Sequence, residues 1–393
     1  MSIKKVAIVG NGVAGITTAY FLAKKGIQVD IYDNNKNVAM ECSYQNGGQI
    51  SVSNAEVWNT WGNVFNGMRW LFKKDAPFAL RPDILGWNKI KWLAGFLGAT
   101  ITNSYDRNTR KTIEYCLRSR ELLLELENEI GIQYDQVKTG IVHIYRNDAS
   151  YKHALHSIQR FQDTGWNVQD YSIDKLTDLK TSNLVGATMC EDDFVGDVNF
   201  FCTELYNHIK IKYGVTKYQN NVTQYQSREP GNIGLDTLTN QYDEVVVAAG
   251  AWTSKLVPQC NIIPVKGYTL TVWDDKELYP NNKLPEYSIL DDDLKIVSST
   301  FPHGRFRVAG TAELAGFEKG EPWDRVIPLM NWVKENTHIE FEGLDRRACY
   351  RPMTPNMLPI TKKIGNVWVN SGAGHLGWTM SMALAEQISY GIH

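Results

Sequence analysis

Short apolar runs and one helical repeat define the start of the chain. Residues 4–10 (KKVAIVG) are mostly apolar and end at a glycine, a pattern typical of a buried parallel strand. Residues 14–25 place apolar side chains at helical spacing, and residues 28–33 (QVDIYD) again have a strand pattern. The succession of strand, helix and strand predicts the βαβ unit that begins many nucleotide-binding domains.

From about residue 56 to 130 the pattern is mainly helical. This segment is unusually rich in tryptophan, with Trp58, Trp61, Trp70, Trp87 and Trp92. Its last part, residues 116–131, is amphipathic and ends at Gly131, a common helix stop. A strand is expected next, at residues 140–146.

The second half of the chain consists mainly of short strand patterns. Two strands are expected within residues 214–250, on either side of a turn signal at 229–232 (EPGN). Strand patterns that we interpret as antiparallel then occupy residues 262–273, 287–291, 294–300 and 305–314. A helix over 323–335 and a strand, glycine loop and helix within 366–389 complete the expected order.

This distribution of patterns predicts an α/β protein in which one domain is assembled from separated segments. The α/β pieces lie at the start, middle and end of the chain, and antiparallel strands lie between them. We assign residues 1–55, 185–262 and 345–393 to a Rossmann-like nucleotide-binding domain. The inserted substrate domain, built on an antiparallel sheet, then comprises residues 56–184 and 263–344.

Charge and cysteine usage narrow the class of protein. The 393 residues include 41 basic and 43 acidic side chains, a net charge of -2 that offers no basic surface for nucleic acid. None of the six cysteines forms a CxxC pair, so we expect free thiols, no metal site and a reducing, cytoplasmic compartment. No apolar stretch reaches the roughly 18 residues of a membrane span.

A glycine motif lies between the first strand and the first helix. Residues 10–15 (GNGVAG) match GxGxxG: Gly10 permits the tight turn, Gly12 lets the backbone approach a pyrophosphate, and Gly15 lets helix and strand pack closely. Asp33 ends the second strand, where its carboxylate can accept hydrogen bonds from a ribose. The motif predicts a dinucleotide site, and by itself it does not separate FAD from NAD.

The residues that follow Asp33 resemble a known family. Residues 41–51 (ECSYQNGGQIS) are similar to the flavin-contacting loop of D-amino acid dehydrogenases of the small-subunit type, within the glycine oxidase and D-amino acid oxidase superfamily. Further blocks in the family's order are 70–72, 76–77, 196–197, 265–268, 288–291, 351–355 and 374–379. The resemblance therefore covers almost the whole chain.

The resemblance implies FAD as cofactor and a fold of the p-hydroxybenzoate hydroxylase type, with the antiparallel sheet roofing the substrate. The C-terminal glycine loop, 372–377, would stabilise negative charge on reduced flavin through its free N–H groups and the following helix dipole. The residues expected to hold FAD are Gly10, Gly12, Val13, Ala14, Gly15, Asp33, Ser43, Asn46, Gly47, Gly48, Gln49, Ile50, Val222, Ala249, Gly250, Gly374, His375, Leu376, Gly377, Trp378 and Thr379.

Three residues are expected to act on the substrate. The resemblance assigns Arg351 to the substrate carboxylate, a task that suits the two-pronged guanidinium, and a structural ion pair is the alternative. Tyr268 could donate its hydroxyl to the same carboxylate or belong to the core. His375 lies in the flavin loop and could contact the ring or the substrate amine.

The expected reaction is oxidative deamination of a D-amino acid, as in amino-acid catabolism. A hydride passes from the α-carbon to flavin N5, and water hydrolyses the imine to a 2-oxo acid and ammonia. The electron acceptor would be a quinone or oxygen. The alternatives are a glycine or sarcosine type of amine oxidase that uses oxygen, and a flavin-binding protein without turnover.

Three local features keep further alternatives open. Leu294 stands where relatives often have a tyrosine that contacts substrate, which leaves the substrate open. Cys349 lies near the place where sarcosine oxidases attach flavin covalently, and a buried thiol is the simpler interpretation. The segments 69–74 and 89–93 combine tryptophan with basic residues, so peripheral contact with the inner membrane is an alternative to packing inside the protein.

Overall fold

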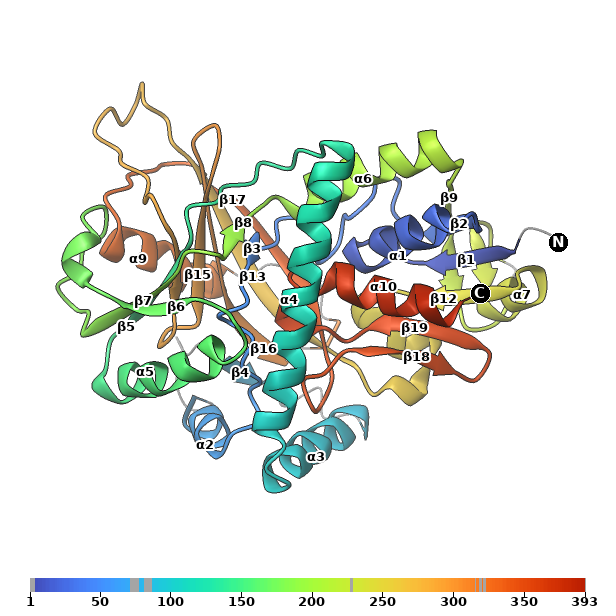
Figure 1. Ribbon diagram of the computed structural model, residues 1–393, viewed down its shortest axis with the longest axis horizontal. Helices are drawn as coiled ribbons and strands as arrows, with labels where there is room; N and C mark the ends of the chain where they lie inside the picture. Colours follow the sequence, from blue (N-terminus) through green and yellow to red (C-terminus); the bar gives the residue numbers. More distant parts are fainter. Residues whose placement is uncertain are drawn as a thin grey trace.

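Two β-sheets lie side by side in the computed structural model, with the long helix α4 running between the two halves (Figure 1). The structure describes residues 4–70, 78–80, 87–226, 229–314, 316–317, 320 and 323–392. One sheet has six strands and carries helices on both faces. The other has nine strands, so the α/β class predicted from the sequence is confirmed.

The six-stranded sheet has the order β18-β19-β12-β1-β2-β9, and all neighbours are parallel except β18 and β19. Its strands are β1 (Lys5–Val9), β2 (Gln28–Asp33), β9 (Thr216–Gln219), β12 (Glu244–Val247), β18 (Ile360–Ile364) and β19 (Val367–Ser371). The central strand β1 is flanked by β2 and β12, so the loop after β1 opens at the point where the strand order changes direction.

Three helices bury one face of this sheet. They are α1 (Val13–Lys24), α6 (Val198–Tyr213) and α10 (Ser381–Gly391), and α1 packs between the other two. The opposite face packs against α7 (Leu235–Gln241) and α8 (Thr253–Leu256). Because α1 and α10 come from the two ends of the chain, the sheet and its helices close only when both ends are present.

The nine-stranded sheet has the order β17-β13-β16-β15-β14-β5-β7-β6, with β4 added beside β16. Its strands are β4 (Phe78–Leu80), β5 (Ile141–Tyr145), β6 (Val168–Tyr171), β7 (Gly186–Cys190), β13 (Ile263–Trp273), β14 (Ser288–Asp291), β15 (Ile296–Phe301), β16 (Arg305–Leu314) and β17 (Asp345–Met353). Two pairs, β14 with β5 and β16 with β4, are parallel, so the sheet is mostly rather than wholly antiparallel.

The remaining elements surround this sheet and connect it to the first. Helix α9 (Ile327–Asn336) packs against it, and α5 (Asp148–Gln162) contacts β5, β6 and β7. The other helices are α2 (Trp61–Trp70), α3 (Trp87–Ile101) and α4 (Tyr105–Ile130), and two short ribbons pair β3 (Gln49–Ile50) with β8 (Phe194–Val195) and β10 (Asn221–Thr223) with β11 (Asn232–Gly234). Short 3-10 turns are η2 (Ile173–Lys175), η3 (Gly250–Trp252), η4 (Pro258–Cys260), η5 (Trp323–Arg325) and η6 (Gly374–Leu376).

The sheet membership of two strands differs from the expected division of the chain. The segments 185–262 and 345–393 were assigned to the nucleotide-binding domain, but β7 and β17, which begin these segments, both pair within the nine-stranded sheet. The division therefore remains a proposal, and the pairing favours moving these two strands to the inserted domain. Among the described helices, none is long and apolar enough to cross a membrane.

Candidate functional site

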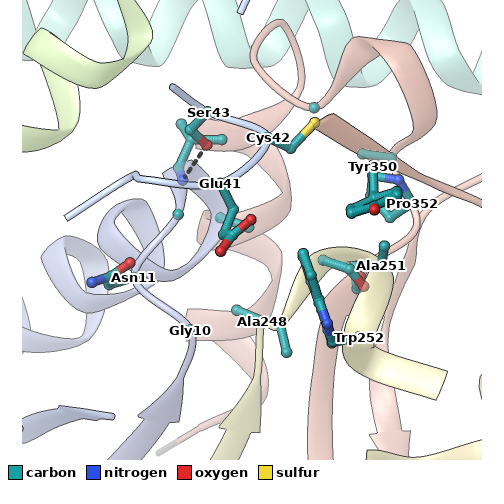
Figure 2. Close-up of a pocket in the computed structure, with 18 of the residues that line it drawn as sticks. Gly10, Asn11, Glu41, Cys42, Ser43, Ala248, Ala251, Trp252, Tyr350 and Pro352 are labelled. Carbon is teal, nitrogen blue, oxygen red and sulfur yellow. Dashed lines mark hydrogen bonds between the residues drawn. The ribbon is translucent and has the colours of Figure 1, made fainter. Parts of the chain in front are cut away.

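A cavity of about 620 Å³ lies where the carboxyl ends of the parallel strands meet the nine-stranded sheet. The loops after β1, β2, β12 and β19 form one wall, and residues of β13, β16 and β17 form the other. Figure 2 shows the meeting of these walls, with Gly10 and Ala248 at the ends of neighbouring strands and Tyr350 and Pro352 opposite them. This is the position at which open α/β sheets bind dinucleotides.

The glycines of the first loop have different structural tasks. Gly10 has a φ of +109, and a Cβ there would lie 2.5 Å from the carbonyl oxygen of Ala248. A Cβ on Gly15 would lie 1.9 Å from the carbonyl oxygen of Gly10, so Gly15 permits close packing of helix and strand and does not itself line the cavity. Gly12, Val13 and Ala14 line it, at the N-terminus of α1.

Two side chains fix this loop from outside. The carboxylate of Asp33 accepts hydrogen bonds from the backbone N–H of Asn11 (3.0 Å) and of Asn35 (2.7 Å). The hydroxyl of Ser43 accepts one from the N–H of Val13 (3.1 Å), drawn in Figure 2. Both residues also line the cavity, so each joins the glycine loop to the space beside it.

Only part of the predicted flavin loop lines the cavity. Ser43, Asn46 and Gly47 line the cavity, whereas Gly48, Gln49 and Ile50 lie behind it. Residues of the nine-stranded sheet bind this loop: the Ser299 hydroxyl donates to the Gly47 carbonyl (2.6 Å), and Arg307 Nη1 donates to the Asn46 carbonyl (2.9 Å). The Gln49 amide in turn donates to the carbonyl of Ser298 (3.2 Å). The loop is thereby held against the roof.

The C-terminal glycine loop and the residues next to it contribute buried polar groups to the wall. Of its predicted residues, Gly374, His375, Gly377 and Trp378 line the cavity, while Leu376 belongs to an apolar core and Thr379 is buried. Several buried polar atoms here have no hydrogen-bond partner among the described residues. They are His375 Nδ1 and Nε2, Trp378 Nε1, Ser381 Oγ and Asn370 Oδ1. Since all four residues line one cavity, they fit a polar ligand such as the flavin.

His375 is a neutral imidazole in this site. Its ring stacks on Trp58, with centroids 4.7 Å apart and planes inclined by 16°. Burial, and then the positive charge of Arg351, lower the pKa of His375 to about 4. Near neutral pH one ring nitrogen therefore carries a proton that it can donate, and the other can accept a hydrogen bond.

Arg351 extends from β17 across Gly267 of the neighbouring strand. A Cβ on Gly267 would lie 2.5 Å from the guanidinium carbon, so a side chain at this position of β13 would displace the guanidinium. Arg351 Nη1 donates to the Thr311 carbonyl (2.8 Å), and Nη2 lies 3.4 Å from that of Gly310. Among the described residues no carboxylate lies within ion-pair distance, so this cavity-lining charge has no anionic partner within the described part of the chain.

Tyr268 does not reach the cavity. It is 0% exposed, packs in the core beneath the roof, and donates its hydroxyl to Glu313 Oε2 (2.6 Å). The cause is strand alternation: the next residue, Thr269, lines the cavity, so Tyr268 points to the opposite face of β13. The structure thus favours the core alternative for Tyr268. Leu294 is 38% exposed in the turn between β14 and β15, and it too lies off the cavity.

The remaining predicted residues also line the cavity, together with several that the sequence did not single out. Val222 on β10, Ala249 and Gly250 all line the cavity. The additional lining residues include Glu41, Cys42, Trp252, Thr269, Ala309, Tyr350 and Ser381. Thr269 and Tyr350 are direct neighbours of predicted residues on their strands, so strand register is the signal that would have identified them.

The geometry and the sequence comparisons together define the class of protein. Residues 5–390 match the family described as DAO, FAD dependent oxidoreductase, and the chain belongs to this family. It is therefore an FAD-dependent oxidoreductase, and the cofactor expected from the sequence is confirmed.

Its relatives include curated D-amino acid dehydrogenases. The chain is 34% identical over 400 residues to D-amino acid dehydrogenase 3 of Mesorhizobium japonicum, covering 98% of this chain and 96% of the relative. It is 33% identical over 404 residues to D-amino acid dehydrogenase of Paramagnetospirillum magneticum, covering 96% and 92%. The predicted resemblance is thus confirmed, and the protein is a D-amino acid dehydrogenase-like FAD oxidoreductase.

Solved structures share the fold at lower identity. Glycine oxidase from Geobacillus kaustophilus superposes with a TM-score of 0.71 at 17% identity, covering 98% of this chain and 94% of that one. L-alpha-glycerophosphate oxidase from Mycoplasma pneumoniae, solved with FAD bound, gives 0.70 at 15% identity, covering 99% and 94%. At these identities the likeness is one of fold.

Proposed function

We propose that this protein oxidatively deaminates a D-amino acid, with Arg351 binding the substrate carboxylate. The observation that supports this most directly is a cavity-lining guanidinium with no carboxylate partner among the described residues. The curated relatives named D-amino acid dehydrogenase supply the class of substrate. A carboxylate would complete the hydrogen bonding of the guanidinium, because two parallel N–H groups suit its two oxygens.

The side chains would position the substrate rather than activate it. Two bonds to the Gly310 and Thr311 carbonyls fix the plane of the Arg351 guanidinium, which in turn orients a bound carboxylate and the α-carbon next to it. Neutral His375 can hydrogen-bond the amine or the cofactor without adding charge. Bound FAD supplies the two-electron acceptor for the hydride that leaves the α-carbon. The resulting imine then takes up water and yields a 2-oxo acid and ammonia.

Replacement of Arg351 tests this function. Arg351→Ala removes the carboxylate partner, so kcat/KM for D-amino acids should fall by about a hundredfold or more, while FAD stays bound. The matched control is Arg346→Ala on the same strand, whose guanidinium instead stacks on Trp323, 3.5 Å from the ring centroid. Equal activity of the Arg351→Ala variant and the wild type would refute the assignment.

The electron acceptor is proposed to be a quinone rather than oxygen. The curated relatives are named dehydrogenases, a term that points to an acceptor other than oxygen. After anaerobic reduction by a D-amino acid, the yellow colour should return slowly in air and rapidly when a soluble quinone is added. Rapid reoxidation by air alone would favour an oxidase.

A membrane surface is the proposed place of this electron transfer. Trp61, Phe65 and Met68 lie at helical spacing on α2 and are 51%, 55% and 49% exposed, and Ile90 and Ile101 of α3 are 47% and 67% exposed. Both helices lie at the lower edge of the molecule in Figure 1. The exposed basic side chains of Arg69 and Lys91 on these helices would attract anionic lipid headgroups. Residues 71–74 of the predicted segment lie outside the described residues.

Vesicle binding tests this surface. Wild-type protein should pellet with vesicles that contain phosphatidylglycerol, and a Trp61→Ser, Phe65→Ser variant should remain in the supernatant with its FAD retained. The matched control is Tyr218→Ser, which removes an aromatic ring that is 41% exposed on β9. Equal pelleting of all three proteins would exclude α2 as the contact.

A further inference from the structure

Two cysteines that line the cavity lie in contact with each other. Cys42 lies in the loop after β2 and Cys349 lies on β17, 307 residues further along the chain, yet their sulfur atoms are 3.6 Å apart. Both are partly exposed and line the cavity, whereas Cys116, Cys190, Cys202 and Cys260 are buried. In Figure 2, Cys42 points from its loop toward the strand that carries Tyr350.

Neighbouring contacts hold the two thiols in this position. Asp345, Arg347 and Cys349 alternate along β17 and therefore share one face of the strand. Asp345 accepts a hydrogen bond from the amide of Gln45, and Arg347 donates to the carbonyl of Met40 while its guanidinium lies 4.4 Å from the ring centroid of Tyr44. The segment 40–45 thus lies along β17, and these contacts on either side of Cys42 hold the two sulfur atoms next to each other.

The two thiols differ in acidity. The hydrogen bond from Cys42 lowers the pKa of Cys349 to about 7, against the effect of burial, and the charges of Arg351 and Arg347 act in the same direction. The pKa of Cys42 is raised well above its ordinary value by the same hydrogen bond and by burial. Cys349 is therefore the more acidic thiol of the pair and Cys42 the less acidic one, as an attacking and a resolving cysteine require.

We propose that Cys42 and Cys349 are an oxidisable dithiol, and that a hydroperoxide converts them to a disulfide that ties the flavin loop to β17. The Cys349 thiolate attacks one oxygen of the peroxide, and the O–O bond breaks. Hydroxide departs as the leaving group, and Cys349 becomes a sulfenic acid. The Cys42 sulfur then attacks this sulfur, and the departing hydroxide takes the Cys42 proton as water. Two thiols and one hydrogen peroxide thereby give one disulfide and two waters.

The disulfide would join two walls of the cofactor cavity. One wall carries Ser43 and Gly47, and the other carries Arg351, two residues from Cys349. A covalent bond between them removes their relative motion. FAD would then dissociate more slowly from the protein with the Cys42–Cys349 disulfide than from the protein with both thiols free.

Peptide mapping of the full-length holoenzyme is the first test. The protein is treated with hydrogen peroxide, its remaining thiols are alkylated, and the digest is analysed by mass spectrometry without reduction. A cross-linked peptide pair containing Cys42 and Cys349, lighter by two hydrogens, is expected in the wild type and in the control Cys260→Ala. It should be missing in Cys42→Ser and Cys349→Ser.

Trapping of sulfenic acid tests the order of events. In Cys42→Ser, dimedone should label Cys349, because the resolving thiol has been removed. The opposite result would overturn the proposed roles: dimedone would label Cys42 in the Cys349→Ser variant and would not label Cys349 in the Cys42→Ser variant. Alkylation of both thiols in peroxide-treated wild type, or a flavin mass on the Cys349 peptide, would overturn the disulfide itself.

Release of FAD tests the consequence. The released FAD is captured by an excess of the apoprotein of a second flavoprotein. The rate of FAD release should be slower by roughly tenfold after peroxide treatment, and dithiothreitol should restore the initial rate. Cys42→Ser and Cys349→Ser should show no such change. An equal rate before and after formation of the cross-link would contradict the proposed joining of the walls.

Discussion

At the scale of single residues, the position of Arg351 depends on the absence of a side chain at Gly267. The guanidinium occupies the space where a Cβ would lie, 2.5 Å from its central carbon. Thr311 has a φ of 53, which is unusual for a threonine, and its carbonyl accepts the hydrogen bond from Arg351 Nη1. The strands β13 and β16 shift register between Lys266 and Tyr268, beside this same contact.

Gly267→Ala should therefore displace the substrate-binding group without touching the cofactor. We expect kcat/KM for D-amino acids to fall by about ten- to a hundredfold, mainly through a higher KM, with FAD content unchanged. The matched control is Gly343→Ala, where an added Cβ meets nothing within 4 Å. A loss of FAD together with activity would mean that Gly267 supports the fold instead.

His375 gives a pH dependence of stability whose sign follows from its depressed pKa. Its pKa is about 4 in the folded protein and about 6.5 in an unfolded chain. As pH falls from about 6.5 to about 4, the unfolded chain binds a proton that the folded protein does not, so the free energy of unfolding decreases. Below the folded pKa both states are protonated and this contribution levels off.

His375→Asn should remove this part of the pH dependence. The loss of unfolding free energy between pH 7 and pH 4.5 should be smaller in the variant by up to about 3 kcal/mol, measured by urea denaturation. His156→Asn, on an exposed position of α5, is the control and should behave as wild type. Equal slopes for His375→Asn and wild type would show that the imidazole is not held neutral.

The residues of the site were predictable to different degrees. The glycine loop and Asp33 follow from local spacing, because one βαβ unit contains them all. The sequence left Tyr268 open between substrate and core, since alternation gives a strand two faces but only the packed sheet shows which one meets the cavity. The contact of Cys42 with Cys349 bridges 307 residues, and no local pattern carries that information.

At the scale of elements, the N-terminus of α6 links the roof sheet to the flavin loop. Asp197 caps this helix by accepting the N–H groups of Asn199 (3.0 Å) and Phe200 (3.1 Å). It also pairs with Arg305 (2.8 Å) and Arg307 (3.4 Å), and Arg307 in turn binds the Asn46 carbonyl. Burial opposes the charge of Asp197, but the two arginines and the helix N–H groups outweigh it, so its pKa is lowered.

Asp197→Asn should separate the cap from the ion pairs. Asparagine still caps a helix, so the variant loses chiefly the pairing, at a cost of roughly 3 kcal/mol in unfolding free energy, and FAD binds less tightly. Because the pKa is depressed, the wild-type contribution is present above about pH 4 and is lost as pH falls through the folded value. Asp236→Asn in α7 is the control; equal stability and FAD affinity of Asp197→Asn and wild type would contradict the linkage.

The elements themselves were predictable where one period dominates a long segment. β13 and β16 are close to the ranges expected from strand patterns, and α4 ends where Gly131 predicts. Helix α4 begins earlier than expected, at Tyr105, because its first turns are mostly polar and acquire their packing from the tertiary structure. Helix α6 was missed although its apolar residues have helical spacing after an Asp cap, so here the sequence carried a usable signal.

At the scale of the whole molecule, both sheets contribute walls to one cavity, so FAD bound in this cavity would contact both of them. FAD at a hundred times its Kd should add about 2.7 kcal/mol to stability. For a chain of this length that raises Tm by about 3 °C, in a single transition. Calorimetry of protein stripped of FAD, with and without added FAD, measures this; two transitions, of which only one moves with FAD, would show that the halves unfold independently.

The pairing of the chain's two ends around the cavity has a consequence for biosynthesis. The glycine loop at 10–15 emerges from the ribosome before the rest of the cavity, whereas Asn370, His375 and Ser381, which line the same cavity, are made only after the long intervening chain. A nascent chain therefore carries an incomplete nucleotide site during most of its translation. FAD should be retained by released protein and not by ribosome-bound chains stalled before residue 367.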